Sequence, residues 1–379
     1  GNEAGFRKRI NGDPRTNEYT RIFYRYGYFK PSLSATYNVD DGVFVGARAE
    51  WVTHGFRKDP FSTKHVIRAG HALRTNSYYF TYDGEFTKAV GVNDILVRAD
   101  LRVPVNVTNF FGLGNNTVFD RNVPGGFQYY RARYSFSNVS VLLRRHLQSW
   151  MRINYGPTMQ YFHIRQKENA DKLLGSGPLA GVDMDGLYNR KLYLGAEGKV
   201  DINSRNNPNL PTRGFVLDAG IKQLFGLTGG SNALTQAYFD MSILASFNAN
   251  PRLVYAFRLG WGRNYGSFEI PQAQYLSGTE NLRGFRRNRF AGRGMLFQNT
   301  EIRLRLADFN TYLFPGSIGL LAFHDIGRVY ADHESSGRWH NGYGGGIWLA
   351  PIRRWVLAVS LAHSKEEKLL PYVSVGFRF

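Results

Sequence analysis

Arginine is the residue type in this sequence whose spacing first suggests chemistry. The stretch TENLRGFRRNRFAGRG, residues 279–294, holds five arginines among small and aromatic residues. A guanidinium presents a planar fork of donors that fits a carboxylate, so ion pairing is the expected chemistry. No helix or strand period runs through the stretch, whereas an alternating strand begins near Met295. We therefore expect a long basic loop between two strands.

Catalytic and metal-binding patterns are weak by comparison. The nine histidines are scattered without the spacing of metal ligands, and the chain has no cysteine. His324 precedes Asp325, but adjacent strand residues face opposite sides, so the two cannot form a dyad. The acidic run Asp332-His333-Glu334 is predicted to be solvated, and the sequence shows neither a phosphate-binding glycine loop nor a nucleophile elbow. We expect no enzyme, no catalytic residues, no cofactor and no metal.

The elements that must position the arginines are predicted to be strands. In PYVSVGFRF, residues 371–379, Val373, Val375, Phe377 and Phe379 share one face, and small or charged residues occupy the other. The segments YAFRLGWG and EIRLRL alternate in the same way, with arginine and glycine recurring on the second face. A soluble sandwich would bury the apolar face. Hydrocarbon outside and a polar, water-filled interior explain the recurring arginines more simply.

These patterns predict an all-β fold, a 16-stranded antiparallel transmembrane β-barrel. Residues 30–379 form the predicted barrel, and residues 1–29 a short periplasmic segment or linker stub. Long connections at 106–126, 165–190 and 266–294 are predicted on the outer side, with mostly short turns opposite. The strands are expected near 30–39, 43–56, 64–75, 78–90, 95–105, 127–145, 150–164, 191–203, 215–228, 234–247, 253–265, 295–308, 317–330, 342–352, 355–364 and 371–379.

Four stretches in order along the chain suggest a family. They are FFGLGN (110–115), SRNNPNLPTRGF (204–215), LSGTENLRGF (276–285) and FHDIG (323–327), followed by the aromatic terminal strand. With them the chain resembles the BamA/TamA superfamily of outer-membrane assembly and translocation proteins, in its surface-antigen barrel domain. The resemblance covers nearly everything after residue 30. We interpret FFGLGN as loop packing and residues 211–214 as a plain periplasmic turn.

The resemblance implies that the sixth outer loop folds into the barrel. Strand parity places Asp325, Phe323 and Gly327 on the lumen face of one strand and Glu301 on that of its neighbour. Within the loop, which carries Leu282, Arg283, Gly284 and Phe285, Arg283 is expected to pair with Asp325, with Glu301 as second acceptor. Gly284 allows a sharp reversal, Gly327 is expected to leave room for loop backbone, and GYGGG (342–346) to permit its close approach. The pair serves either as an anchor or as a moving part in substrate handling.

For function, the resemblance implies assistance to protein insertion or translocation at the bacterial outer membrane. A weak seam between the first and last strands would expose edges that template an incoming strand. We assign Pro31, Phe377 and Phe379 to this seam. The expected partners are client outer-membrane proteins or periplasmic accessory proteins, and outer-membrane lipids including lipopolysaccharide.

Two alternatives remain open, because 29 residues cannot hold a periplasmic receiving domain. The barrel could anchor or display an N-terminal domain, such as a hydrolase. It could also be a pore that favours anions, because the net charge is +19 and arginines are predicted at lumen positions. Nucleic acid is disfavoured, since these arginines alternate inside a barrel. The lumen arginines are Arg258, Arg303, Arg305 and Arg378.

Overall fold

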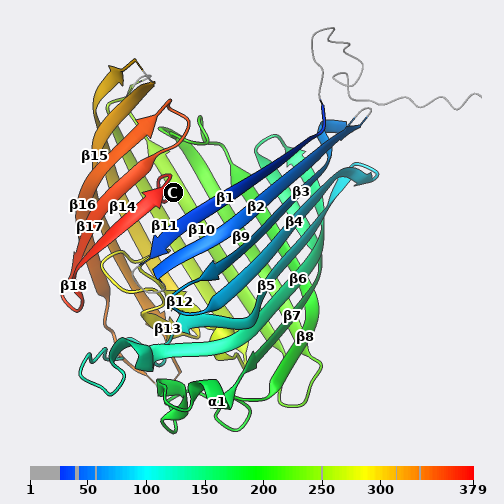
Figure 1. Ribbon diagram of the computed structural model, residues 1–379, viewed down its shortest axis with the longest axis vertical. Helices are drawn as coiled ribbons and strands as arrows, with labels where there is room; N and C mark the ends of the chain where they lie inside the picture. The colour runs from blue at the N-terminus through cyan, green and yellow to red at the C-terminus, as the bar shows by residue number, and fades with distance from the viewer. Residues whose placement is uncertain (1–25, 39–41, 56–57, 249–250, 313, 333) are drawn as a thin grey trace, which may run out of the picture.

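A single antiparallel sheet dominates the protein (Figure 1), as seen in a computed structural model that describes residues 26–38, 42–55, 58–248, 251–312, 314–332 and 334–379. The sheet has sixteen strands, which confirms the predicted fold class and strand number. Neighbours in the sheet follow chain order, from β1 through β11 and then from β14 to β18. Within the described residues, β1 and β18 are the two edges and do not pair with each other.

Fourteen of the sixteen strands have eleven residues or more, which is enough to cross a bilayer at a tilt. They are β1 Tyr28–Asn38, β2 Gly42–Gly55, β3 Lys58–Ala72, β4 Ser77–Val90, β5 Asn93–Asn109, β6 Arg131–Gln148, β7 Met151–Ile164, β8 Arg190–Asn203, β9 Gly214–Gly226, β10 Leu234–Ala245, β11 Leu253–Gly266, β14 Gly294–Asn310, β15 Pro315–Tyr330, β16 His340–Pro351, β17 Leu357–Ser364 and β18 Lys368–Val375.

Short elements lie in the long connections. They are η2 Gly126–Tyr130, α1 Gln166–Asn169, η3 Leu173–Gly175, η4 Ile270–Gln272, and the small hairpin of β12 Gln274–Leu276 and β13 Phe290–Gly292. None of the helices in the described ranges has the length and hydrophobicity required to span a membrane.

Side-chain burial is inverted relative to a soluble protein, as β14 shows. Glu301 and Arg303 are both 2% exposed, whereas the intervening Ile302 is 45% exposed. Leu304, the next outward residue, is 37% exposed. An apolar outer face around a polar interior is the pattern of a strand with hydrocarbon outside. We therefore treat the sheet as membrane-spanning.

The predicted last strand was wrong at its end. Residues 371–379 were expected to continue as one strand, but β18 ends at Val375 and Gly376 adopts φ +91°. That left-handed conformation favours glycine and turns the chain out of the sheet. Phe377 then packs edge-on against Trp348 on the interior face, with ring centroids 5.6 Å apart. Phe377 and Phe379 therefore do not lie on the strand edge, whereas Pro31 does, within β1.

The long connections contribute to two of the apolar clusters. One cluster joins Phe110, Ile164, Leu174 and Ile270 from three of these connections and their flanking strands. A second lies at the arginine-rich loop, residues 279–294 within the sixth outer loop. It consists of Leu276, Leu282, Phe285, Phe290, Phe297 and Val329. The loops thus pack on the strands' polar faces by bringing their own apolar side chains. This packing holds the arginine-rich loop in place.

Candidate functional site

Arg283 lies at the centre of a buried ion-pair cluster. Its Nε and Nη2 donate to the two carboxylate oxygens of Asp325, at 2.7 and 2.8 Å. Its Nη1 donates to Glu301 at 2.6 Å, and its backbone N–H donates to Asp325 at 2.9 Å. The guanidinium also lies 3.6 Å from the ring centroid of Phe323. The structure thus brings together the four side chains that the sequence pattern had grouped.

The cluster excludes water almost completely. The side chains of Arg283, Glu301 and Asp325 are 4%, 2% and 0% exposed. Burial alone lowers the pKa of the Arg283 guanidinium, but the hydrogen bonds and charges of Asp325 and Glu301 outweigh it and the pKa is raised. The arginine therefore stays cationic while bonded to two carboxylates.

The residues around Arg283 fasten the loop to the last strands. Leu282 and Phe285 are buried in the apolar cluster beneath the loop. Gly284 has φ +93°; its N–H donates to the Tyr372 hydroxyl at 3.0 Å, and its carbonyl accepts from Ser364 at 2.6 Å. The Tyr372 hydroxyl donates to the Phe285 carbonyl at 2.8 Å. Side chains of β17 and β18 thus bind the backbone of the loop directly through hydrogen bonds.

The glycines of the wall differ in what they accommodate. A Cβ on Gly342 would lie 1.7 Å from the Arg283 carbonyl oxygen, so this glycine allows the loop backbone to approach. Gly344 and Gly346 instead face the backbone of β17. The expectation for Gly327 was wrong, because a methyl group added there would lie 3.1 Å from the Leu276 side chain rather than against loop backbone. The sequence could not show which loop residue would face each glycine.

We expect Gly342→Ala to displace the loop without unfolding the barrel. The added methyl would overlap the Arg283 carbonyl, and overpacking of this kind costs about 1–3 kcal/mol. Limited proteolysis of the folded protein should then cut within residues 279–294. Gly198→Ala in β8 is the matched control, because no atom lies within 4 Å of the added methyl. Equal protease resistance in both variants would contradict the close approach.

The cluster extends from Glu301 to the end of the described chain. Arg303 donates to Glu301 at 2.7 Å and to the main-chain oxygen of Phe379 at 2.6 Å. Its guanidinium lies 4.0 Å from the Phe377 ring centroid. Arg378 donates to the carbonyl of Gly278 in the loop at 3.0 Å. Loop and terminal segment are therefore tied through the same polar network.

The other arginines predicted in the lumen have partners too. Arg258 makes a bidentate contact with Asp240 and donates to the Glu280 carbonyl at 2.9 Å. Arg305 lies 3.6 Å from Asp308. Much of the positive charge is thus balanced by neighbouring carboxylates or by backbone oxygens.

Two assignments from the sequence missed contacts between loops. Glu334, expected to be solvated, accepts hydrogen bonds from the backbone N–H groups of Asn115 and Asn116 at 2.7 and 2.8 Å. Asp332 pairs with Arg293, and His333 lies outside the described residues. Asn115 also exchanges two hydrogen bonds with the backbone of Val329. FFGLGN therefore packs as expected, but it does so by clamping another loop.

The turn at residues 204–213, expected to be a plain periplasmic turn, also contacts distant strands. Leu210 and Phe377 both pack against the buried cluster that includes Trp348 and Leu321. No local signal in the turn's sequence specifies a contact with strands more than one hundred residues away.

A sequence profile described as the Omp85 superfamily domain matches residues 32–379. The chain belongs to the Omp85 superfamily. The family resemblance drawn from the four motifs is thereby confirmed, and this Omp85 barrel is an outer-membrane protein. No curated protein sequence matches it at a significant level.

Solved structures share the fold of this Omp85 barrel at low identity. BamA from Haemophilus ducreyi lacking POTRA domains 1–3 has a TM-score of 0.66 and 12% identity, over 92% of this chain and 70% of that one. CdiB from Escherichia coli has a TM-score of 0.58 and 10% identity, over 92% and 61%. CdiB from Acinetobacter baumannii has 0.56 and 14%, over 92% and 59%.

Proposed function

We propose that this barrel assists the insertion or translocation of proteins at the outer membrane, and that the β1–β18 seam is where a client strand is received. The observation that carries the proposal is the pair of unjoined edges among the described strands. An unpaired edge presents a row of N–H and C=O groups that an incoming strand can satisfy. Inside a bilayer that pairing is strongly favoured, since hydrocarbon offers no alternative partner.

The strands beside the seam support the proposal through their lengths. β17 and β18 have eight residues each, compared with seventeen in β14. Each edge strand also carries a proline, Pro31 in β1 and Pro371 in β18, which cannot donate to a ladder. Because Gly376 then turns the chain inward, residues 377–379 do not extend the β18 edge. Pairing between β18 and β1 could therefore form few hydrogen bonds, and a client strand would have few to displace at this edge.

The Arg283 cluster has a structural part in the same proposal. It holds the arginine-rich loop against β14 and β15, while Tyr372 of β18 and Ser364 of β17 hold the loop backbone. The loop therefore supports the strands next to the seam from the lumen side. This arrangement keeps the short edge strand in register while its outer edge stays open.

A folding assay in liposomes tests the proposal. An unrelated outer-membrane protein, diluted from urea, is expected to fold faster into liposomes that contain this barrel than into empty liposomes. Folding is followed by the heat-modifiable band shift on a gel. Liposomes with an equal mass of a closed barrel of another family control for bilayer defects. Absence of acceleration over empty liposomes would overturn the insertion role.

A further inference from the structure

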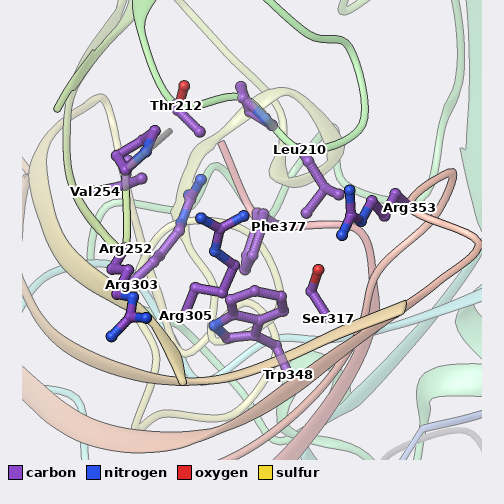
Figure 2. Close-up of a pocket in the computed structure, with 12 residues that line it drawn as sticks. Leu210, Thr212, Arg252, Val254, Arg303, Arg305, Ser317, Trp348, Arg353 and Phe377 are labelled. Carbon is purple, nitrogen blue, oxygen red and sulfur yellow. The ribbon is translucent and has the colours of Figure 1, made fainter. Parts of the chain in front are cut away.

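Two adjoining cavities open at the end of the barrel where the short turns lie. The first, of about 90 Å³, is lined by turn residues such as Leu210 and by the ends of β11, β14, β15 and β16 (Figure 2). The second, of about 210 Å³, lies beside it against Trp355, Val375 and Phe379. Pro211 and Phe377 line both cavities and so form the wall between them.

Positive charge gathers in these cavities. Arg252, Arg303, Arg305 and Arg353 line the first, and Arg205 lines the second. Figure 2 shows the four arginines of the first cavity arranged around Phe377 and Trp348. Among the described residues that line either cavity, none is an aspartate or a glutamate.

One carboxylate outside the cavity linings lies near two of these arginines. Asp308 lies 3.6 Å from Arg305 and 3.5 Å from Arg353. Arg303, with a side chain only 2% exposed, is bonded through Nε and Nη2. Its Nη1 is buried and has no hydrogen-bond partner among the described residues. A buried, unpartnered donor is costly unless a ligand or water satisfies it.

The remaining walls are apolar and aromatic. Leu210, Val254, Trp348 and Phe377 line the first cavity, and Trp355, Val356 and Phe379 the second. A ligand that fits both features has an anionic group next to apolar or aromatic groups. The position of the first cavity narrows the class of ligand further. Val254, which lines the first cavity, is 6% exposed and its neighbour Tyr255 is 44% exposed, so the first cavity lies on the lumen face, whereas the second also borders Val375, which is 79% exposed.

We infer that these cavities form a binding site for an acidic peptide segment, with carboxylates on the arginines and neighbouring apolar side chains against Trp348 and Phe377. An extended peptide can place a carboxylate in the small first cavity and an apolar side chain in the second. Four of the five arginines line the first cavity, on the lumen face, and this position favours a peptide in the lumen over a phospholipid in the bilayer. The site goes beyond the seam proposal and binds its ligand whether or not the barrel accelerates folding.

Fluorescence anisotropy in detergent micelles tests the site with the whole folded chain. The probe is a blocked, fluorescein-labelled peptide of sequence Gly-Leu-Glu-Phe-Glu-Gly, and its partner has both glutamates replaced by glutamine. We expect Arg305→Gln and Arg353→Gln each to raise the Kd of the acidic probe about tenfold, the loss typical of one charge-assisted contact. Arg152→Gln is the matched control, an arginine at the same end of the barrel on β7 that lines neither cavity.

Each result either supports or overturns the acidic-peptide site. Tighter binding of the glutamate probe than of the glutamine probe, lost in the two variants and kept in the control, supports the site. Equal binding of the two probes, or no binding to heat-modifiable wild-type protein, overturns it. Competition by inorganic phosphate or by phosphatidylglycerol micelles as strong as by unlabelled acidic peptide would overturn the peptide class. The probe comparison uses wild-type protein, so it decides the matter even if a variant fails to fold. The liposome assay is independent of all these results.

Discussion

Arg283→Ala is expected to leave a folded, heat-modifiable barrel whose arginine-rich loop is released. The substitution removes the cation that Asp325 and Glu301 share, while both carboxylates stay buried at 0% and 2% exposure. Breaking a buried pair from one side costs about 3–5 kcal/mol, because the remaining charges lose their partner without regaining water. Here Asp325 loses its bidentate partner, whereas Glu301 keeps its bond to Arg303.

The loop is expected to give way before the sheet does. The strands are joined by continuous ladders, whereas the loop depends on Arg283, a small apolar cluster and backbone bonds to Tyr372 and Ser364. Limited proteolysis should therefore cut within residues 279–294, and conductance in planar bilayers should rise. The heat-modifiable shift of the intact barrel should persist.

Arg68→Ala provides the matched control. Arg68 pairs with Asp83 at 2.7 Å, but the two side chains are 41% and 40% exposed. Solvent screens such a pair, so its loss should cost about 1 kcal/mol or less and leave cleavage and conductance unchanged. If Arg283→Ala behaved like Arg68→Ala, the buried cluster would not be what holds the loop.

The strands could be predicted from the sequence because their signal is local. In β14, the alternation of polar and apolar residues from Glu301 to Leu304 indicates which face meets hydrocarbon. This pattern can be interpreted without knowing any distant contact. The same parity placed Asp325 and Glu301 on one face, so a partner for Arg283 could be expected near them. The strand number followed by counting such segments.

The contacts that depend on loops crossing the barrel could not be predicted in this way. The sequence predicts Glu334 to be solvated, because nothing near it in the chain indicates its hydrogen bond to the backbone of Asn115. The sequence places Leu210 in a turn, although its side chain packs against the buried cluster that includes Trp348. The alternation of residues 371–379 is real, but the positive φ of Gly376 ends the strand early. A periodic pattern shows which face a residue would take, and it does not show where the chain leaves the sheet.

Cross-linking the seam is expected to abolish any acceleration of client folding. The sequence contains no cysteine, so Ser32→Cys in β1 and Ser374→Cys in β18 would introduce the only two thiols. Joining them with a flexible bismaleimide ties the two edges that a client strand would separate. If clients enter there, the folding rate should fall to that of empty liposomes, whereas the barrel itself keeps its heat-modifiable shift.

The control uses one of the same thiols within an existing ladder. Ala358→Cys with Ser374→Cys links β17 to β18 at a register pair, Ala358 opposite Ser374, and leaves the seam free. Facing strand residues are close enough for the short link that a disulfide requires. Acceleration should survive this second link. Loss of activity in both cross-linked proteins would point to strand stiffness in general, and retention in both would show that clients do not pass between β1 and β18.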